Sequence, residues 1–233
     1  MEKFSIVIPV YNEGRNLRIL VPRIYKELKK FKFELIIVDD NSTDNTVKIL
    51  KRFKKKNLRH IIRREERDLS KSCVLGFKKT RYKNIIVMDG DLQHKPSDIK
   101  KFLHIFYKYS PDIIVGSRDL FKDKKHNLNI FRLLASRILI LIVNILLGKK
   151  TSDPMSGFFM FKKKIFLGSQ KELIKKGYKI LLDLLYVKKQ KTKVVDLKIN
   201  FDNRMKGKSK MSIKILFYLI SMILKKFIIK FFP

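Results

Sequence analysis

The stretch NIIVMDGDLQHKP, residues 84–96, places two aspartates one residue apart directly behind the apolar run 85–88. A short, nearly continuous apolar run of this kind is typical of a strand that is covered on both faces. Comparable runs recur at 4–10, 35–38, 60–64 and 113–115. Between the first of these runs lie segments whose apolar residues have the spacing of a helix. Alternating strands and helices predict an α/β fold with a doubly wound, mostly parallel sheet.

Polar segments follow four of these predicted strands. They read PVYNE (9–13), VDDNSTDNT (38–46), DGDLQHKP (89–96) and GSRD (116–119). Ligands of a parallel sheet bind beyond the carboxyl ends of its strands, so these segments predict the position of the site.

Four carboxylates gather at this predicted rim, on Asp39, Asp40, Asp89 and Asp91. Helix capping accounts for neighbouring serines such as Ser42 and Ser97, but it does not account for the acids. Like charges in one place destabilise a fold unless a cation joins them. The rim is therefore expected to bind a cation.

The composition is strongly basic, with 55 Lys and Arg against 21 Asp and Glu and a net charge of +34. Such a chain is expected to meet anions: nucleic acid, a phosphorylated substrate or an anionic membrane. Solvated surface lysines are the alternative interpretation for many of these charges. Nucleic acid is the least favoured partner, because no recognised nucleic-acid-binding motif occurs. A single cysteine, Cys73, fits a reducing compartment, and the N-terminus reads as a strand rather than a signal peptide.

The second half of the chain is less regular. The apolar stretch 130–147 contains Arg132 and Arg137, which predicts an amphipathic or partly buried helix rather than a membrane span. Segment 153–163 is expected to be a loop that enters a strand, 177–187 the start of a helix, and 193–201 a strand. The tail, 213–233, holds a short apolar core followed by two lysines, which favours a basic helix at the membrane interface.

The D-x-D pattern at Asp89 and Asp91 suits a hard divalent ion, and Gln93 offers a further oxygen. Arg118 and the basic segment 203–212 carry groups suited to phosphates. Metal and phosphate sites at one rim predict a nucleotide-linked substrate.

These motifs resemble the family 2 glycosyltransferases, which have the Rossmann-like GT-A fold. Within that family they are most similar to the polyprenyl-phosphate sugar synthases, typified by dolichol-phosphate mannose synthase. The resemblance covers about residues 4–212 and is carried by seven motifs: IPVYNE, DDNSTDNT, MDGDLQHKP, GSR, DPMSGFF, GYKILLDLL and F-x-x-R-x-x-G-x-SKM. The last of these and DPMSGFF are the narrowest, and they point to transfer onto a lipid phosphate.

The resemblance implies roles for individual residues. Residues implied to enclose the nucleoside are Pro9, Tyr11, Glu13, Val38 and Asp40. Residues implied to surround the metal and the sugar diphosphate are Asp89, Gly90, Asp91 and Gln93, with Asp91 and Gln93 as the metal ligands. Arg118, Arg204 and Lys210 are implied to hold phosphates, and Arg132 and Ser209 to lie near the acceptor. Asp89, Asp91 and Arg118 are the implied catalytic residues.

The chain departs from the family pattern in two places. Lys71 and Cys73 stand in segment 68–77, where relatives usually have small residues or glycine. Many relatives carry C-terminal transmembrane spans, whereas here only the tail follows a catalytic domain of residues 1–212. Attachment is therefore expected to be peripheral, at the cytoplasmic face of the membrane, or to depend on a membrane-protein partner.

The implied activity is a metal-dependent, inverting transfer of a hexose, using Mg²⁺ or Mn²⁺. Mannose from GDP-mannose, passed to a polyprenyl or dolichyl phosphate, is the first expectation. One alternative is transfer of glucose or an aminosugar from a UDP-sugar to undecaprenyl phosphate. The other is a family 2 enzyme that acts on a polysaccharide acceptor.

Overall fold

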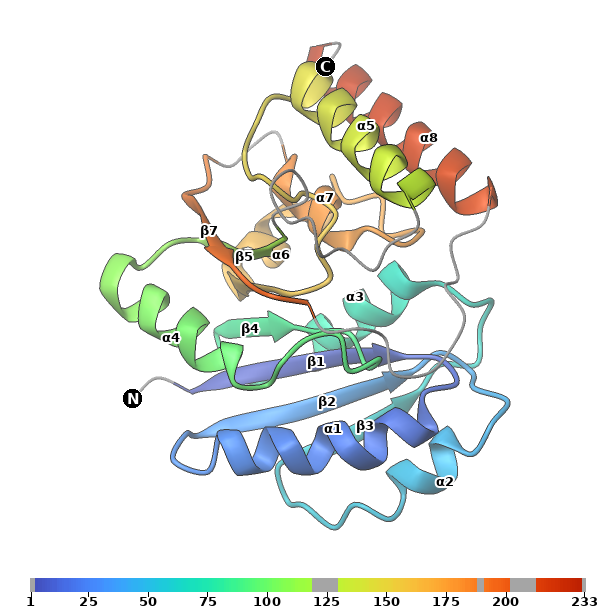
Figure 1. Ribbon diagram of the computed structural model, residues 1–233, viewed down its shortest axis with the longest axis vertical. Coiled ribbons are helices and arrows are strands. Elements are labelled where there is room, and N and C mark those ends of the chain that lie inside the picture. The colour runs from blue at the N-terminus through green and yellow to red at the C-terminus, as the bar shows by residue number, and fades with distance from the viewer. Residues whose placement is uncertain (1–2, 119–129, 188–190, 202–212, 232–233) are drawn as a thin grey trace.

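The computed structural model describes residues 3–118, 130–187, 191–201 and 213–231, which form a seven-stranded sheet with helices on both faces (Figure 1). The strands are β1 (Phe4–Val10), β2 (Phe33–Asp39), β3 (Leu58–Ile62), β4 (Asn84–Val87), β5 (Ile113–Ser117), β6 (Phe159–Lys162) and β7 (Val194–Lys198). The helices are α1 (Gly14–Glu27), α2 (Thr46–Leu50), α3 (Leu69–Lys79), α4 (Asp98–Tyr109), α5 (Ile130–Leu147), α6 (Lys163–Ser169), α7 (Ile180–Leu185) and α8 (Ile213–Phe231). The predicted strands all form, with ends that differ by at most three residues.

The strand order is β3-β2-β1-β4-β6-β5-β7. Within the described residues β6 alone runs antiparallel to its neighbours, β4 and β5, and every other pairing is parallel. The prediction of a mostly parallel α/β sheet is confirmed. Because β6 runs backwards, the loop that precedes it lies at the same edge of the sheet as the loops that follow β1, β2, β4 and β5.

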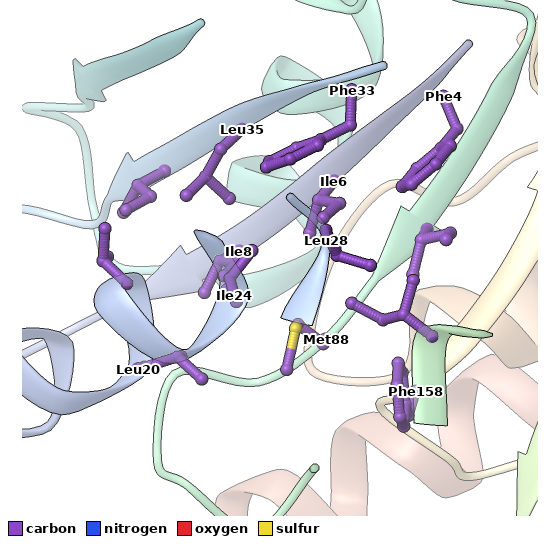
Figure 2. Packing of buried hydrophobic residues seen from close by; sticks show 14 of the residues in the cluster. Phe4, Ile6, Ile8, Leu20, Ile24, Leu28, Phe33, Leu35, Met88 and Phe158 are labelled. Atoms are coloured by element: carbon purple, nitrogen blue, oxygen red, sulfur yellow. The ribbon is translucent and has the colours of Figure 1, made fainter. Parts of the chain in front are cut away.

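The sheet separates two apolar cores. On one face α1 places Leu20, Ile24 and Leu28 against strand residues that include Ile6 and Ile8, as Figure 2 shows. The intervening residue of β1, Val7, belongs to the core on the other face, beneath α3, α6 and α7. Both faces of β1 are therefore buried, which explains why its sequence is apolar at every position except Ser5 instead of alternating.

α5 and α8 lie side by side at the end of the molecule opposite α1 and α2 (Figure 1). They share a small apolar core of their own, to which Val143 and Leu147 of α5 and Met222 and Ile223 of α8 contribute. Each helix also carries large apolar side chains that remain exposed: Ile138, Leu141 and Ile145 on α5, and Phe217, Ile220, Leu224 and Ile228 on α8. Over the residues that the structure describes, none of the helices combines the length and apolarity that crossing a bilayer requires.

Candidate active site

Asp40, at the end of β2, forms a buried ion pair with Arg63. The guanidinium donates from Nε to Asp40 Oδ1 at 2.7 Å, and the Asp68 amide donates to Asp40 Oδ2 at 2.8 Å. Both side chains of the ion pair are about 95% buried. The cation that compensates Asp40 is therefore Arg63, which directly follows β3 and which the sequence analysis did not single out.

Asp39 is fully buried beside this pair. Its Oδ2 accepts a hydrogen bond from the Ser42 amide at 3.0 Å. Its Oδ1 has no hydrogen-bond partner among the residues described. A buried carboxylate oxygen in this condition is costly, so it marks a point at which a polar ligand would be stabilised.

The two serines that capping was expected to explain do not cap a helix. The Ser42 hydroxyl instead accepts a hydrogen bond from the Asn12 amide at 2.8 Å, which joins the loops after β1 and β2. Ser97 stands at the N-cap position of α4, but its side chain makes no capping hydrogen bond. The capping interpretation of both residues was wrong, and for Ser42 a tertiary contact replaces the local one.

The PVYNE loop and the strand ends beside it contain the residues implied to enclose a nucleoside. Tyr11 is half-buried, and the guanidinium of Arg67 lies 4.6 Å from the centre of its ring. The Glu13 carboxylate accepts a hydrogen bond from the Asn16 amide group at 2.6 Å. Pro9 and Val38 pair with each other in the sheet and are buried there, so their backbones rather than their side chains face the rim.

The D-x-D turn after β4 is held by a buried histidine. The Asp89 amide donates to His94 Nδ1 at 3.0 Å, and the imidazole stacks on Phe158 with centroids 4.8 Å apart. Burial lowers the pKa of His94, so the ring is neutral and its Nδ1 can accept. Within the turn, Asp91 Oδ1 accepts from the main-chain amide of Gln93 at 3.1 Å, which fixes the Asp91 side chain against the backbone of the turn.

Asp91 and Gln93 fit a divalent ion of the magnesium type. Among the described residues no group of three His, Cys, Asp or Glu side chains could hold a metal by itself. Magnesium usually binds through one or two carboxylates and takes its other oxygens from water and substrate phosphates. The buried carboxylate of Asp91, on the same turn as the amide group of Gln93, supplies the one or two protein oxygens that such an ion needs.

Arg118 directly follows β5 and pairs with Asp153 of the DPMS motif. Its Nε donates to Asp153 Oδ2 at 2.7 Å and its Nη2 to Oδ1 at 3.1 Å. Burial acts to lower the pKa of Arg118, but the Asp153 carboxylate, which is completely buried, outweighs it and raises that pKa. The phosphate-binding residue implied by the resemblance is thus fixed in place by a carboxylate.

Asp89 lies next to the same loop. A methyl group at Gly157 would come within 2.4 Å of the Asp89 carboxylate, so the absence of a side chain at 157 makes room for it. The reversed direction of β6 brings Asp153 and Gly157 to this edge. Asp89, Arg118 and Asp153 therefore form one charged cluster.

Lys179 joins this cluster, and the sequence analysis did not select it. Its ammonium group donates to the Met155 carbonyl at 2.9 Å. Burial lowers the pKa of Lys179, and the nearby Arg118 lowers it further, while Asp153 and Asp89 act in the opposite direction. The feature of the sequence that could have identified Lys179 was its position in the motif GYKILLDLL.

The structure describes only some of the remaining predicted site residues. Arg204, Ser209 and Lys210 lie outside the described residues, as does the side chain of Arg132, whose backbone belongs to α5. Gly90 is buried against Val10, where a methyl group would come within 2.8 Å of that side chain. Segment 68–77 is largely the helix α3, in which Cys73 is buried and the Lys71 amide donates to Asp68.

Comparisons with solved structures agree with the fold. Glucosyl-3-phosphoglycerate synthase from Mycobacterium tuberculosis, in complex with phosphoglyceric acid, superposes with a TM-score of 0.70 at 15% identity, over 98% of this chain and 80% of that one. A second structure of that protein, in complex with Mn²⁺, UDP and glucosyl-3-phosphoglycerate, gives a TM-score of 0.69 with the same identity and coverage. These structures support the GT-A architecture.

Sequence comparisons are more specific. The dolichol-phosphate mannosyltransferase of Pyrococcus furiosus is 37% identical over 218 residues, which is 92% of this chain but 61% of that protein. The protein of the same name from Mycosarcoma maydis is 32% identical, over 97% of this chain and 80% of its own length. The model of the family described as "Glycosyl transferase family 2" matches residues 5–168. The resemblance of the motifs is confirmed: the chain belongs to glycosyl transferase family 2 and has the GT-A fold.

Proposed function

We propose that this protein transfers a mannosyl group from GDP-mannose to a polyprenyl or dolichyl phosphate, with inversion at the anomeric carbon. The observation that carries the proposal is the rim itself, where the Asp91–Gln93 turn lies at the same edge as the cations of Arg118 and Lys179. The identity of 37% and 32% with two dolichol-phosphate mannosyltransferases supports the choice of sugar and acceptor.

The mechanism follows from charge. Asp91 and Gln93 would hold a divalent ion, which when bound supplies positive charge to the departing nucleotide diphosphate. Arg118 and Lys179 would provide cations for the phosphates of donor and acceptor, and Asp153 keeps Arg118 charged despite its burial. A lipid phosphate is already an anion at neutral pH, so its attack needs little help from a general base. A sugar hydroxyl would need one.

Donor and acceptor can be identified in one assay. The full chain is incubated with lipid phosphate, Mg²⁺ or Mn²⁺, and radiolabelled GDP-mannose or, separately, UDP-glucose. Label in the lipid extract from GDP-mannose is the expected result. Label from UDP-glucose would favour the UDP-sugar alternative, and label only in aqueous polymer would favour a polysaccharide acceptor. Absence of labelled lipid with both donors would refute the proposal.

We further propose that the protein is peripheral on the cytoplasmic face of the membrane and rests there on α5 and α8. Exposed apolar side chains on α8 recur at one-face spacing, and Phe217 is 68% exposed. Ile145 of α5 is 71% exposed. Together with the net charge of +34, this suits an anionic lipid surface, to which each nearby lysine or arginine adds about 1 kcal/mol.

Vesicle sedimentation tests this attachment. Phe217→Ser combined with Ile228→Ser should reduce binding to vesicles that contain anionic lipid. Tyr107→Ser removes an exposed aromatic side chain from α4, far from α5 and α8, and is the matched control. Equal binding of both variants would show that another surface or a membrane-protein partner provides the anchor.

A further inference from the structure

The turn that precedes Lys179 is conformationally demanding. Lys175 has φ 55° and Gly177 has φ 97°, so two residues of one short turn occupy the left-handed region. A lysine rarely adopts this conformation without support from its surroundings. The contacts that hold the turn therefore decide where Lys179 lies.

One side of the turn is held by the first turn of α3. The Gly177 amide donates to Asp68 Oδ2 at 2.7 Å, and the Gly177 carbonyl accepts from the Ser70 amide at 2.9 Å. Asp68 in turn donates its own amide to Asp40, at the end of β2. Through Asp68, this side of the turn is connected to Asp40 and so to the loop that follows β2.

The other side is held by Asp183 of α7. Its Oδ2 accepts from the Lys175 amide at 2.9 Å, and its Oδ1 lies 2.7 Å from the ammonium of Lys226 in α8. The Lys226 ammonium also donates to the carbonyls of Asp183 at 3.1 Å and Glu172 at 3.3 Å. A single carboxylate thus joins α8 to the strained residue of the turn.

The Lys226–Asp183 pair is almost completely buried, with side-chain exposures of 1% and 3%. Apolar side chains of similar volume would often hold α8 in place as well or better, because burying two charges is costly. The Lys226 ammonium differs from such apolar side chains because it attracts Asp183 Oδ1 and also donates to the main-chain carbonyls of Asp183 and Glu172. The other carboxylate oxygen, Asp183 Oδ2, is then held where it accepts from the Lys175 amide.

We propose that Lys226 is a positioning residue for sugar transfer: through Asp183 it fixes the turn 175–177 and thereby places Lys179 in the active site. The position of α8 is then coupled to the rate of sugar transfer. The link to turnover rests on the proposed function, whereas the link from Lys226 to the turn does not.

Kinetics of the full chain test the coupling, with the neighbouring lysine as control. Lys226→Met should lower kcat by about tenfold to a hundredfold, because small misplacements of a catalytic group have effects of this size. KM for the nucleotide sugar should change less than kcat, since the contacts that hold the Asp91–Gln93 turn and the Asp40–Arg63 pair do not include Lys226. Lys225→Met removes an exposed lysine one residue away and should leave both constants unchanged when the lipid phosphate is dispersed in detergent, so that vesicle binding does not contribute. Equal kcat for the two variants would overturn the proposal.

A second variant separates positioning from general destabilisation. Lys226→Met leaves a buried carboxylate without its cation, whereas Lys226→Met with Asp183→Asn removes that charge and keeps an oxygen for the Lys175 amide. The double variant should recover part of the lost thermal midpoint while kcat remains low. Recovery of both would mean that the pair only stabilises the fold, against the proposal.

Hydrogen exchange provides a readout that does not need activity. The amides of residues 175 and 177 should exchange at least tenfold faster in Lys226→Met than in Lys225→Met or the parent chain. Unchanged exchange would overturn the positioning role whatever the assay gives. A parent chain that exchanges as expected but labels no lipid would instead refute the proposed function.

Discussion

The guanidinium of Arg118 and the carboxylate of Asp153 face each other through two hydrogen bonds, of 2.7 Å and 3.1 Å. This bidentate pair joins the end of β5 to the loop before β6, so it fixes one wall of the site. Phe201 lies against the same guanidinium, with its ring centre 5.2 Å away. Such a geometry uses the planar fork of arginine, which lysine lacks.

Arg118→Lys is therefore expected to impair turnover although it keeps the charge. One ammonium cannot reproduce two parallel hydrogen bonds, so Asp153 would lose part of its support in a buried place. We expect kcat to fall about a hundredfold. The measurement is steady-state transfer to lipid phosphate, with circular dichroism to verify the fold. A loss below threefold would argue against the fork.

Asp91→Ala should abolish transfer and leave the fold intact, because it removes a carboxylate implied to hold the metal. The loss is expected to be about a hundredfold or more. Isothermal titration with Mn²⁺ in the presence of the nucleotide should show the corresponding loss of metal binding. Asp112→Ala is the control, since Asp112 lies just before β5, at the opposite edge of the sheet. Comparable losses of metal binding and transfer in both variants would argue against a role for Asp91 in holding the metal.

Arg63→Met should reduce the free energy of unfolding by about 3–5 kcal/mol, because it leaves the Asp40 carboxylate buried without its cation. Urea denaturation measures this loss. Adding Asp40→Asn to the same chain should restore part of it, since the amide needs no counter-charge. If the loss of the double variant equalled the sum of the losses for Arg63→Met alone and Asp40→Asn alone, the two side chains would not interact energetically.

His94 should make the metal-free protein sensitive to acid. Burial lowers the pKa of His94 below the ordinary 6.5, with Arg118 acting in the same direction and the carboxylates of Asp89, Asp91 and Asp98 opposing it. Between the lowered pKa and 6.5 the unfolded chain binds more protons than the folded one, so stability falls as the pH drops below about 6.5. The loss approaches ~1.4 kcal/mol per pH unit in that window.

The unfolding midpoint in urea at pH 7.5 and at pH 5.5 measures this sensitivity. His94→Gln should show a smaller drop between the two values than the parent chain. His104→Gln, a change at an exposed histidine of α4, should show the full drop. An identical drop in all three chains would mean that other groups cause the acid sensitivity.

The strands were predictable because a strand buried on both faces needs a run of apolar residues, and such a run is visible in the sequence. The apolar runs that became β1, β2, β4 and β5 are continuous, and the polar segments behind them mark the site edge. No pattern in the sequence indicates that β6 runs in the opposite direction. Phe159–Phe161 is apolar on both faces, and this pattern is the same whichever way a strand runs.

The pairing partners within the site were not predictable for a related reason. The resemblance named Asp40 and Arg118, but Arg63 and Asp153 become their partners only when distant segments meet. Lys179 is one cation in a chain with 55 Lys and Arg residues, so composition could not distinguish it. Its bond to the Met155 carbonyl and its place beside Arg118 and Asp153 distinguish it, and both arise from tertiary structure.

Gly157 gives the Asp89 carboxylate a back wall made of main chain. Because a methyl group at 157 would come within 2.4 Å of that carboxylate, the carboxylate fills the space that any side chain at this position would need. Position 157 can therefore accept a larger residue only if the acidic turn moves, which makes the shape of the metal-side loop depend on a residue that carries no chemistry of its own.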